Sequence, residues 1–217
     1  MQSTKSFIDI KSELEKKKIS LFIKRIFDIV ASIGGLIVLS PMLIIVAICI
    51  KLDSKGPVFF KQKRVGKNKE IFEIYKFRTM VTDAEKLGKQ ITVGNDSRIT
   101  GVGKFIRKCK LDEFPQLINV LKGEMSLVGP RPEVHKYVEL YDEYQEQILL
   151  VQPGITDYAS IEFRNENEIL GESDNPEKTY IEDIMPIKID LNMKYIKNIS
   201  LIEDIKLIFF TIVAIAK

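Results

Sequence analysis

The chain has 217 residues, of which 45% are hydrophobic and 29% are charged. This length fits one domain, and the composition excludes both an intrinsically disordered protein and a protein made only of membrane-spanning helices. The net charge of +3 conceals an asymmetry, because residues 1–78 carry 16 Lys and Arg against 7 Asp and Glu, whereas residues 79–217 carry 17 against 23. A basic N-terminal third predicts an anionic partner surface, either nucleic acid or acidic phospholipid.

A long apolar segment near the N-terminus decides between these two surfaces. Residues 29–50 form a run of 22 residues without a charge, which is about the length of a membrane-spanning helix. The stretch before it, KSELEKKKISLFIKRIF, is basic and amphipathic, which suits either a membrane surface or a solvated helix. We therefore predict an anionic phospholipid membrane, and no nucleic acid, as the partner of this region.

Two features of the apolar run argue against a plain membrane span. Ser40-Pro41 lies in its middle, where the proline removes one backbone donor and is expected to kink or break a helix. Cations flank the run on both sides, whereas the positive-inside rule expects them on the cytoplasmic side. A re-entrant helix–break–helix satisfies both features, with an ordinary proline-kinked span as the alternative. The flanking cations are Lys24, Arg25, Lys51, Lys55, Lys61, Lys63 and Arg64.

The remaining sequence predicts an α+β fold, in which a mostly helical domain at 57–217 follows the membrane segment at 1–56. VFFKQKRV and EIFEIYKF are rich in β-branched and aromatic residues and are separated by GKNK, which predicts a β-hairpin over 58–77. Apolar residues three and four positions apart predict a helix from residue 114. The other predicted elements are helices at 104–110, 135–150 and 187–198, a polar surface loop at 165–180, and an amphipathic interfacial helix at 207–216.

An adjacent acid pair, Asp112 and Glu113, stands at the entrance of the helix predicted from residue 114. Aspartate is a favoured N-cap, but with Asp112 as the cap the third helical residue is Pro115, which has no N–H to be capped. A carboxylate at a helix N-terminus is stabilised as the anion, and in phosphate chemistry it can attack phosphorus or hold a divalent cation. The residues themselves leave a structural cap and a chemical role as alternatives.

Several cations are candidates for binding phosphate beside the acid pair. Arg131 lies between two prolines, which stiffen its loop, and its planar guanidinium suits bidentate phosphate contact. Lys76 and Arg78 end the second strand of the predicted hairpin at alternate positions, so both are expected to point to one face. Arg107 precedes the acids by about one helical turn. Each cation taken singly is also explained by a solvated charge or by a lipid headgroup contact.

Four stretches of this chain resemble the bacterial sugar transferases, a family of monotopic phosphoglycosyl transferases that act on polyprenol phosphate. The stretches are KRIFDIVASIGGLIVLSPMLIIVAICIKLDSKGPVFFKQKRVG, IYKFRTM, DSRITGVGKFIRKCKLDEFPQLINVLKGEMSLVGPRPE and QPGIT. They run from residue 24 to residue 156, which is most of the chain. The combination is far more specific than any single short motif.

The resemblance implies an enzyme of the bacterial inner (cytoplasmic) membrane whose active site lies at the cytoplasmic face. Members transfer a sugar 1-phosphate from a UDP-sugar to undecaprenyl phosphate, which yields a sugar diphospholipid and UMP, requires Mg²⁺, and is the first membrane step of a glycoconjugate pathway. The family pattern places the covalent aspartate nucleophile at Asp112 and the Mg²⁺ ligand at Glu113. Its Ser-Pro pair, which makes the membrane helix re-entrant, falls on Ser40 and Pro41.

The resemblance also makes the basic residues near the acid pair candidates for substrate binding. The sequence departs from the family pattern after residue 151, where Gln152, Asp157 and Tyr158 replace residues found in many members, and the sugar is therefore not predicted. His135 is the one histidine of the chain, which excludes a histidine-rich metal site. The predicted substrate-binding residues are Lys76, Arg78, Arg107, Arg131 and Arg164.

Two other classes of protein would share parts of this pattern. One is a bitopic polyprenyl-phosphate glycosyltransferase, which transfers the sugar without its phosphate and releases UDP. The other is a membrane-surface scaffold without enzymatic activity, in which the acid pair is structural. The released nucleotide separates the three functions, because it is UMP, UDP or none. The oligomeric state, a homodimer included, and the pathway stay open.

Overall fold

The computed structural model describes residues 10–82, 84 and 96–216. The chain is mostly helical and contains four short strands in its described part, so the α+β prediction is supported. The helices are α1 (Ile10–Lys16), α2 (Lys18–Asp53), α3 (Gly101–Lys108), α4 (Gln116–Lys122), α5 (His135–Val138), α6 (Tyr158–Glu162), α7 (Glu166–Gly171), α8 (Pro176–Thr179), α9 (Met185–Lys197) and α10 (Leu201–Ala216). The strands are β1 (Phe59–Val65), β2 (Ile71–Phe77), β3 (Ser126–Val128) and β4 (Gly154–Thr156).

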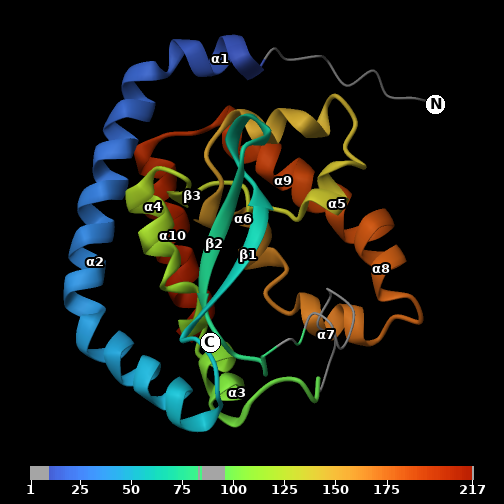
Figure 1. Cartoon of the computed structure of the whole chain (residues 1–217). Coiled ribbons are helices and arrows are strands. Elements are labelled where there is room, and N and C mark those ends of the chain that lie inside the picture. The colour runs from blue at the N-terminus through green and yellow to red at the C-terminus, as the bar shows by residue number, and fades with distance from the viewer. Residues whose placement is uncertain (1–9, 83, 85–95, 217) are drawn as a thin grey trace.

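Helix α2 is the longest element and contains the predicted Ser40-Pro41 break. It runs along one side of the molecule and then turns beneath it toward α3 (Figure 1). The backbone is helical throughout Lys18–Asp53, with Pro41 inside the helix, so the prediction of two helices separated by a break is wrong. The reason lies next to the proline. An N–H at position 41 would bond to the carbonyl of Ile37, and the hydroxyl of Ser40 donates to that carbonyl at 2.8 Å instead.

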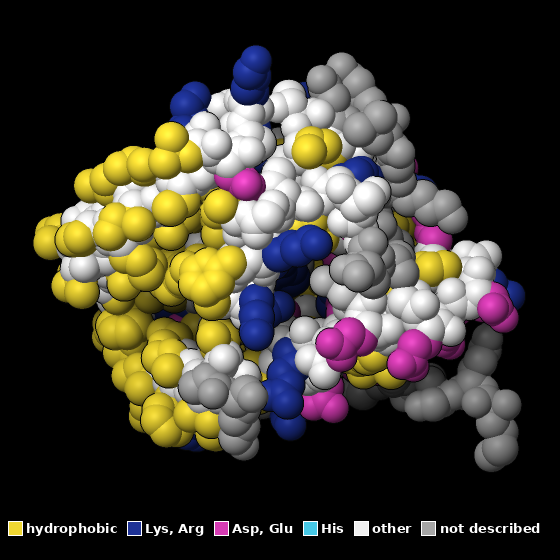
Figure 2. Space-filling model, turned by 90° about the horizontal axis from the view of Figure 1, so that it is seen from below, with side chains coloured by type: hydrophobic (Ala, Val, Ile, Leu, Met, Phe, Trp, Pro, Cys, Tyr) yellow, Lys and Arg dark blue, Asp and Glu magenta, His cyan; other side chains and the backbone are white. Residues whose placement is uncertain are grey.

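The outward-facing side of α2 is apolar. Only 11% of the most apolar 18-residue stretch of α2 is buried, whereas a core helix of a soluble protein would be mostly buried. Among the described residues it is the one helix long and apolar enough to cross a membrane. Helix α10 adds further exposed apolar side chains, among them Phe209, Phe210 and Ile212. Hydrophobic side chains gather on one side of the molecule, with Lys and Arg at their edge (Figure 2). An exposed apolar surface of this kind indicates membrane association.

The predicted hairpin is confirmed. Strands β1 and β2 pair in antiparallel register from Phe59 opposite Phe77 to Val65 opposite Ile71. The turn between them contains Asn68 and Lys69 with positive φ angles of 54° and 66°, a conformation that asparagine adopts more readily than most residues. The alternation along β2 buries Phe72 and Ile74 against the core.

A second, smaller sheet holds the loop that contains Arg131. Strands β3 and β4 are parallel, with Ser126 opposite Gly154 and Val128 opposite Thr156. The first residue of β4 lies very close to the backbone just after β3, since a Cβ added to Gly154 would lie 2.0 Å from the amide nitrogen of Gly129. Glycine is therefore required at position 154 by the approach of the neighbouring chain.

Two predictions about the C-terminal half are wrong, and each has a local cause. The segment 135–150 is not one helix, because α5 ends at Val138 and a 3₁₀ turn spans Gln145–Leu150. Asp142 and Gln145 exchange side chain–backbone hydrogen bonds of 2.8 and 3.0 Å, a reciprocal cap that starts the later turn separately. The segment 165–180 is not a plain loop, because it contains α7 and α8, the latter capped by the side chain of Asn175.

The helices predicted from residue 114, at 104–110 and at 187–198 are confirmed as α4, α3 and α9, and the apolar C-terminus is part of α10. Part of the basic amphipathic stretch forms α1 and the beginning of α2. The first nine residues of the segment predicted at 1–56 lie outside the described residues.

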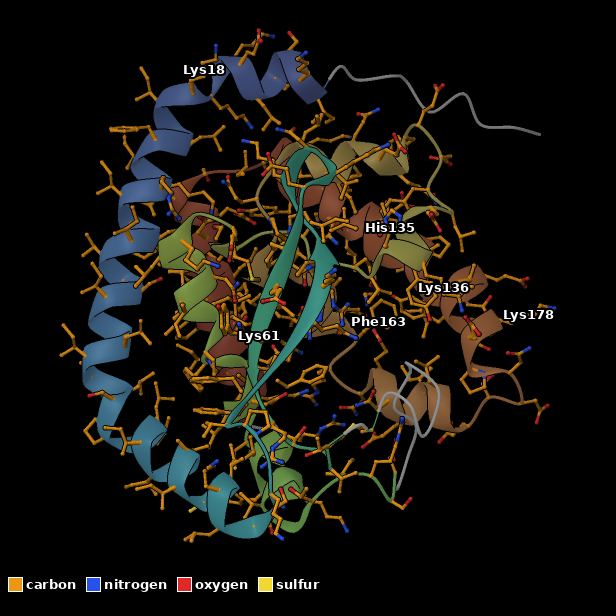
Figure 3. All side chains as sticks on the ribbon, in the orientation of Figure 1. Lys18, Lys61, His135, Lys136, Phe163 and Lys178 are labelled. Carbon is orange, nitrogen blue, oxygen red and sulfur yellow. The ribbon has the colours of Figure 1, made fainter. Side chains whose placement is uncertain are left out.

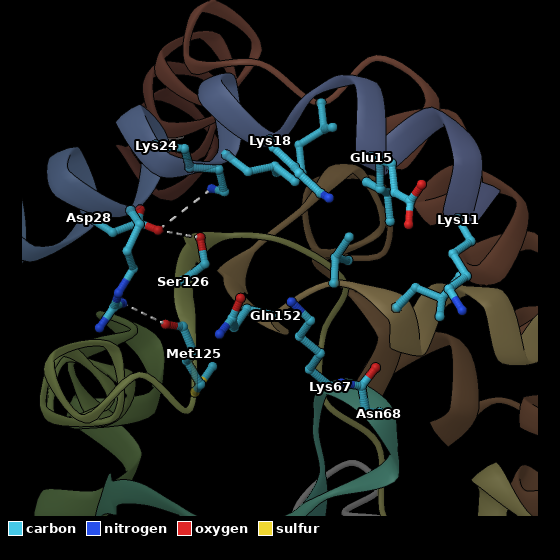
Figure 4. A pocket seen from close by; sticks show the side chains of 16 residues that line it. Lys11, Glu15, Lys18, Lys24, Asp28, Lys67, Asn68, Met125, Ser126 and Gln152 are labelled. Atoms are coloured by element: carbon cyan, nitrogen blue, oxygen red, sulfur yellow. Dashed lines mark hydrogen bonds and ion pairs between the residues drawn. The ribbon is translucent and has the colours of Figure 1, made fainter.

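A buried charge cluster, which we call the anchor cluster, joins α2 to the rest of the protein. Lys24 bonds to Asp204 of α10 at 2.6 Å, and Asp28 accepts hydrogen bonds from the hydroxyl of Ser126 at 2.7 Å and the amide of Leu127 at 3.2 Å. The hydroxyl of Tyr195 donates to Asp204 at 2.7 Å. Figure 4 shows Lys24, Asp28 and Ser126 at one wall of a largely apolar cavity of about 330 Å³. The anchor cluster consists of Lys24, Asp28, Ser126, Tyr195 and Asp204.

Candidate active site

The acid pair lies in a short 3₁₀ turn between α3 and α4. This turn spans Leu111–Glu113, and Lys110 before it has a positive φ angle of 54°. Helix α4 begins only at Gln116, its N-cap is Pro115, and no side chain caps it. The interpretation of Asp112 as the cap of this helix is therefore wrong, and the acid pair has no capping role there.

Glu113 is held by two cations from different parts of the chain. Lys76 of β2 donates to its Oε1 at 2.9 Å. The guanidinium of Arg131 reaches both oxygens, with Nη2 at 2.5 Å from Oε1 and Nη1 at 3.3 Å from Oε2. Burial alone would raise the pKa of Glu113, but Arg131 and Lys76 outweigh it and hold this pKa well below its usual range. Glu113 is therefore a fixed carboxylate anion.

Asp112, its neighbour, is held by no such partner. Within the described part of the chain its carboxylate makes no hydrogen bond or ion pair with another side chain. Burial raises its pKa above the ordinary value, and repulsion from Glu113 raises it further, while Lys76 and Arg107 act in the opposite direction. The two adjacent carboxylates thus differ: Glu113 is bound by two cations, whereas Asp112 has no side-chain partner in the described part of the chain.

Both acids line a pocket of about 300 Å³ with many charged side chains. Six cationic and four acidic residues line it, so the lining carries a net positive charge that favours an anionic ligand. The cations are Arg64, Lys76, Arg107, Lys110, Arg131 and Lys188, and the acids are Asp112, Glu113, Glu133 and Glu166. The other lining residues are Gln62, Val134, Tyr137, Asn167 and Tyr180.

Of the predicted substrate-binding residues, Lys76, Arg107 and Arg131 lie in this pocket. Arg107 donates from Nε to the hydroxyl of Thr79 at 2.8 Å, which orients its guanidinium, and burial lowers its pKa. The positive charge of Arg131 is stabilised above all by Glu113, which raises its pKa. The three cations come from β2, α3 and the loop after β3, three elements that the tertiary fold brings together.

The structure does not bring Arg78 or Arg164 to the pocket. Strand β2 ends at Phe77, so the alternation that placed Arg78 on the same face as Lys76 does not extend to it. Arg78 instead donates to the carbonyls of Ser54 at 2.8 Å and Lys55 at 2.5 Å, just after the end of α2. Arg164 is exposed, and its guanidinium donates to the carbonyl of Ala214 in α10 at 3.4 Å.

His135 also lies outside the pocket. It stands at the start of α5 near the surface (Figure 3), where it pairs with Glu139 at 3.2 Å. Its side chain is 66% exposed, which identifies it as a surface histidine. Histidine chemistry therefore plays no part in the arrangement around Asp112.

Sequence reasoning missed the residues of the opposite pocket wall. Tyr180 donates to Glu133, and Lys188 of α9 bonds to Glu166 of α7 at 2.9 Å. Glu133 directly follows the Pro-Arg-Pro, so its position along the chain was a usable signal. Glu166, Tyr180 and Lys188 carried none, because they come from segments more than thirty residues downstream that only the tertiary fold places here.

A Mg²⁺ ion fits the acid pair only as part of a shared coordination sphere. No group of three or more His, Cys, Asp or Glu side chains that could hold a metal occurs among the described residues. Mg²⁺ is commonly bound by one or two carboxylates together with waters and substrate phosphates. Asp112 and Glu113 can supply two carboxylates, and a cation there would offset the repulsion that raises the pKa of Asp112. The residues present therefore fit this ion.

Comparison with known proteins points to one family. The family model described as bacterial sugar transferase matches residues 19–217. The chain is 42% identical over 194 residues to the UDP-N-acetylgalactosamine-undecaprenyl-phosphate N-acetylgalactosaminephosphotransferase of Aeromonas hydrophila, covering 88% of this chain and 43% of that protein. It is 40% identical over 198 residues to the UDP-glucose:undecaprenyl-phosphate glucose-1-phosphate transferase of Escherichia coli K12, covering 89% and 40%.

A third relative matches this chain over nearly its whole length. The chain is 41% identical over 202 residues to the exopolysaccharide production protein PSS of Rhizobium leguminosarum bv. phaseoli, covering 89% of this chain and 95% of that protein. This chain thus spans less than half of the Aeromonas and Escherichia proteins and nearly all of the Rhizobium protein.

Proposed function

The chain belongs to the bacterial sugar transferase family, and we propose on that basis that it transfers a sugar 1-phosphate from a UDP-sugar to undecaprenyl phosphate. The products would be a sugar diphosphate linked to undecaprenol and UMP. Two relatives are named for this type of transfer, with N-acetylgalactosamine and glucose as their sugars. Since these sugars differ, the proposal covers the reaction and leaves the sugar unassigned.

The observation that carries the proposal is the contrast between the two acids. Asp112 is half-buried beside a glutamate that two cations hold, and it has no side-chain partner among the described residues. A carboxylate that no other side chain binds keeps lone pairs available for attack. An oxygen of Asp112 would attack the phosphorus that bears the sugar, while the bond from that phosphorus to UMP breaks and UMP leaves with the electron pair. The product is an acyl phosphate, in which the phosphorus of the sugar 1-phosphate is bonded to an oxygen of Asp112.

The second half of the reaction regenerates the enzyme. A phosphate oxygen of undecaprenyl phosphate would attack the same phosphorus, and the bond from this phosphorus to Asp112 breaks. The carboxylate is released as the anion, and the sugar diphospholipid leaves. Two successive displacements at one phosphorus predict ping-pong kinetics.

The cations of the pocket supply charge stabilisation in both steps. Arg131 has a planar fork that suits two phosphate oxygens, and Lys76 and Arg107 add charge from two other elements. Binding of substrate would divide Arg131 and Lys76 between Glu113 and the phosphates. Glu113 would also be the main protein ligand of Mg²⁺, which neutralises phosphate charge when bound.

We further propose that α2 enters one leaflet of the inner membrane and returns, so that the active site faces the cytoplasm. Cations flank the apolar run on both sides, and the end of α2 turns beneath the protein toward α3 (Figure 1). A UDP-sugar is water-soluble and undecaprenyl phosphate is lipid-bound, so their reaction requires a site at the membrane surface. The proline-kinked span is the alternative topology.

Cysteine labelling separates the two topologies. With Cys49 and Cys109 replaced by serine, Ser20→Cys and Ser54→Cys are introduced one at a time, and a membrane-impermeant thiol reagent is applied to each side. A re-entrant helix predicts labelling of both cysteines from the cytoplasmic side only. Labelling of one position from each side would establish a span.

Nucleotide release tests the proposed reaction directly. The purified protein is incubated with UDP-glucose, UDP-galactose or the two N-acetylated analogues, together with undecaprenyl phosphate and Mg²⁺. Release of UMP is expected for at least one sugar. Release of UDP would instead indicate a glycosyltransferase, and no release from any UDP-sugar would favour the scaffold. With a UDP-sugar alone, mass spectrometry should detect one phospho-sugar added to the peptide that contains Asp112.

A further inference from the structure

The loop that carries Arg131 is joined to strand β4 by backbone hydrogen bonds. Strands β3 and β4 are parallel, so their carboxyl ends lie at the same edge of the sheet. The amide of Gly129 donates to the carbonyl of Thr156 at 3.0 Å, and the amide of Gly154 donates to the carbonyl of Pro130 at 2.9 Å. The residue after Thr156, Asp157, therefore lies beside the Pro-Arg-Pro.

Asp157 is completely buried, and its two carboxylate oxygens have different partners. One accepts from the amide of Ser160 at 2.6 Å and caps α6. The other accepts from the amide of Arg131 at 3.2 Å. Its exposed fraction is 0%, and no cationic side chain forms an ion pair with it in the described structure. Burial of a carboxylate without an ion-pair partner is costly, so both of its backbone bonds are needed.

The cap of α6 does not explain why this residue is an aspartate. Asparagine and serine cap helices about as well as aspartate, and each needs only one oxygen to do so. The second oxygen has the amide of Arg131 as its partner. That amide is also the only backbone donor of the Pro-Arg-Pro, because Pro130 and Pro132 have no N–H.

We propose that Asp157 is a positioning residue, which fixes the backbone of Arg131 so that its guanidinium lies over the acid pair. This inference rests on the proposed function, in which Arg131 contacts the phosphates of the substrate. The flanking prolines restrict the φ angles of their own residues, and the amide of Gly154 holds the carbonyl of Pro130. The amide of Arg131, on the other side of the same peptide bond, has Asp157 as its partner, from a segment 26 residues further along the chain.

Two substitutions separate this role from helix capping. Asp157→Asn and Asp157→Ser both keep an oxygen for the amide of Ser160, and both lose the second acceptor oxygen. A matched control is Asn175→Ser, which changes the cap of α8 outside the pocket. Both Asp157 variants are expected to lower kcat/KM at least tenfold, with Asn175→Ser unchanged.

Hydrogen exchange gives a readout that does not depend on activity. In a peptide over 130–132 the amide of Arg131 is the only exchangeable backbone hydrogen. We expect it to be protected in the parent protein and to exchange at least tenfold faster in both Asp157 variants, while the amides of α6 stay protected. An unprotected Arg131 amide in the parent would overturn the inference, even if neither variant folded.

A double-mutant cycle with Arg131→Lys tests whether Asp157 acts through Arg131. The two losses in kcat/KM are expected to be strongly non-additive, whereas a purely structural role of Asp157 would give additive losses. Unchanged exchange and kcat/KM in the Asp157 variants, with Arg131→Lys impaired, would overturn the positioning role alone. A fully active Arg131→Lys would refute the proposed role of Arg131 in the reaction, while the exchange measurement would still decide the contact.

Discussion

Lys24 in α2 and Lys76 in β2 each bind a carboxylate, the first pair buried and the second half-buried, but the clusters around them differ in which groups they leave unpaired. In the anchor cluster, Asp28 and Asp204 each accept two hydrogen bonds, and Lys24 is bonded to Asp204 and to the carbonyl of Val128. In the pocket, Glu113 takes both Lys76 and Arg131, and Asp112 has no side-chain partner among the described residues.

The difference separates a closed charge cluster, which stabilises the structure, from an open one, for which we propose a chemical role. A closed cluster is costly to open, because each remaining charge would be buried without a partner. Its members come from α2, β3, α9 and α10, so it fixes the membrane helix to the rest of the protein. The pocket has more cations than acids, so its cations can also bind the anionic oxygens of a ligand. Its carboxylate without a side-chain partner, Asp112, can form a new bond. The following predictions test this contrast in order of expected effect.

Asp112→Asn should abolish turnover without lowering stability. The amide keeps the shape of the side chain but cannot attack phosphorus, so UMP release should fall on the order of 10³-fold or more. The melting temperature should be unchanged or higher, because burial beside Glu113 disfavours the ionised carboxylate. UMP assays and thermal unfolding in the same detergent check both parts. An active variant that forms no phospho-sugar adduct would return the acid pair to a structural role.

Lys24→Met should strongly lower the stability of the protein, in contrast to Asp112→Asn, which should lower activity alone. Removal of one partner from a buried ion pair typically costs about 3–5 kcal/mol, since Asp204 would remain buried without its cation. Lys18→Met is the matched control, because Lys18 is exposed on the same helix and is expected to cost less than about 0.5 kcal/mol. Denaturant unfolding measures both. Equal stability of the two variants would show that the anchor cluster does not hold α2 in place.

Arg131→Lys preserves the charge and removes the bidentate fork. We expect kcat/KM to fall about 10- to 100-fold, which corresponds to about 1.4–2.7 kcal/mol of transition-state stabilisation. Arg164→Lys is the control, because Arg164 lies outside the pocket and should retain full activity. A variant at position 131 that matches the parent would mean that the Pro-Arg-Pro is only a structural turn.

Glu113→Gln should have the smallest effect on the maximal rate and a specific effect on Mg²⁺. A neutral amide is a poorer ligand for a hard cation, so the Mg²⁺ concentration at half-maximal rate should rise about tenfold or more. A Mg²⁺ titration of UMP release, with the metal first removed by EDTA, measures this shift. An unchanged half-saturation would exclude Glu113 as the metal ligand.

The local sequence was sufficient to predict helices and strands that follow from the residue pattern of a single segment. The hairpin follows from β-branched and aromatic runs around GKNK, and α4 follows from apolar spacing after Pro115. The apolar run predicted a long membrane helix, and that helix is present as α2. Its predicted break failed because Ser40 bonds to the carbonyl that Pro41 leaves free, a side-chain contact that composition does not show.

The acid pair and Arg131 could be identified from the sequence alone, since adjacent acids and an arginine between prolines are unusual local patterns. Arg78 shows the limit of such reasoning, because one residue beyond the end of β2 was enough to direct its side chain to the end of α2. Nothing in the local sequence indicated that Lys188 and Glu166 form a wall of the same pocket, or that Asp157 bonds to the amide of Arg131.

The sequence by itself therefore determined the family, the long apolar helix and the acid pair for which we propose a catalytic role. Only the tertiary structure decided which of the two acids is held and which is available, and which cations hold it. The physical reason is distance along the chain: hydrogen bonds between near neighbours follow from local geometry, whereas Lys76 and Arg131 lie 37 and 18 residues from Glu113. Such contacts form only when the packing of the whole chain brings them within bonding distance.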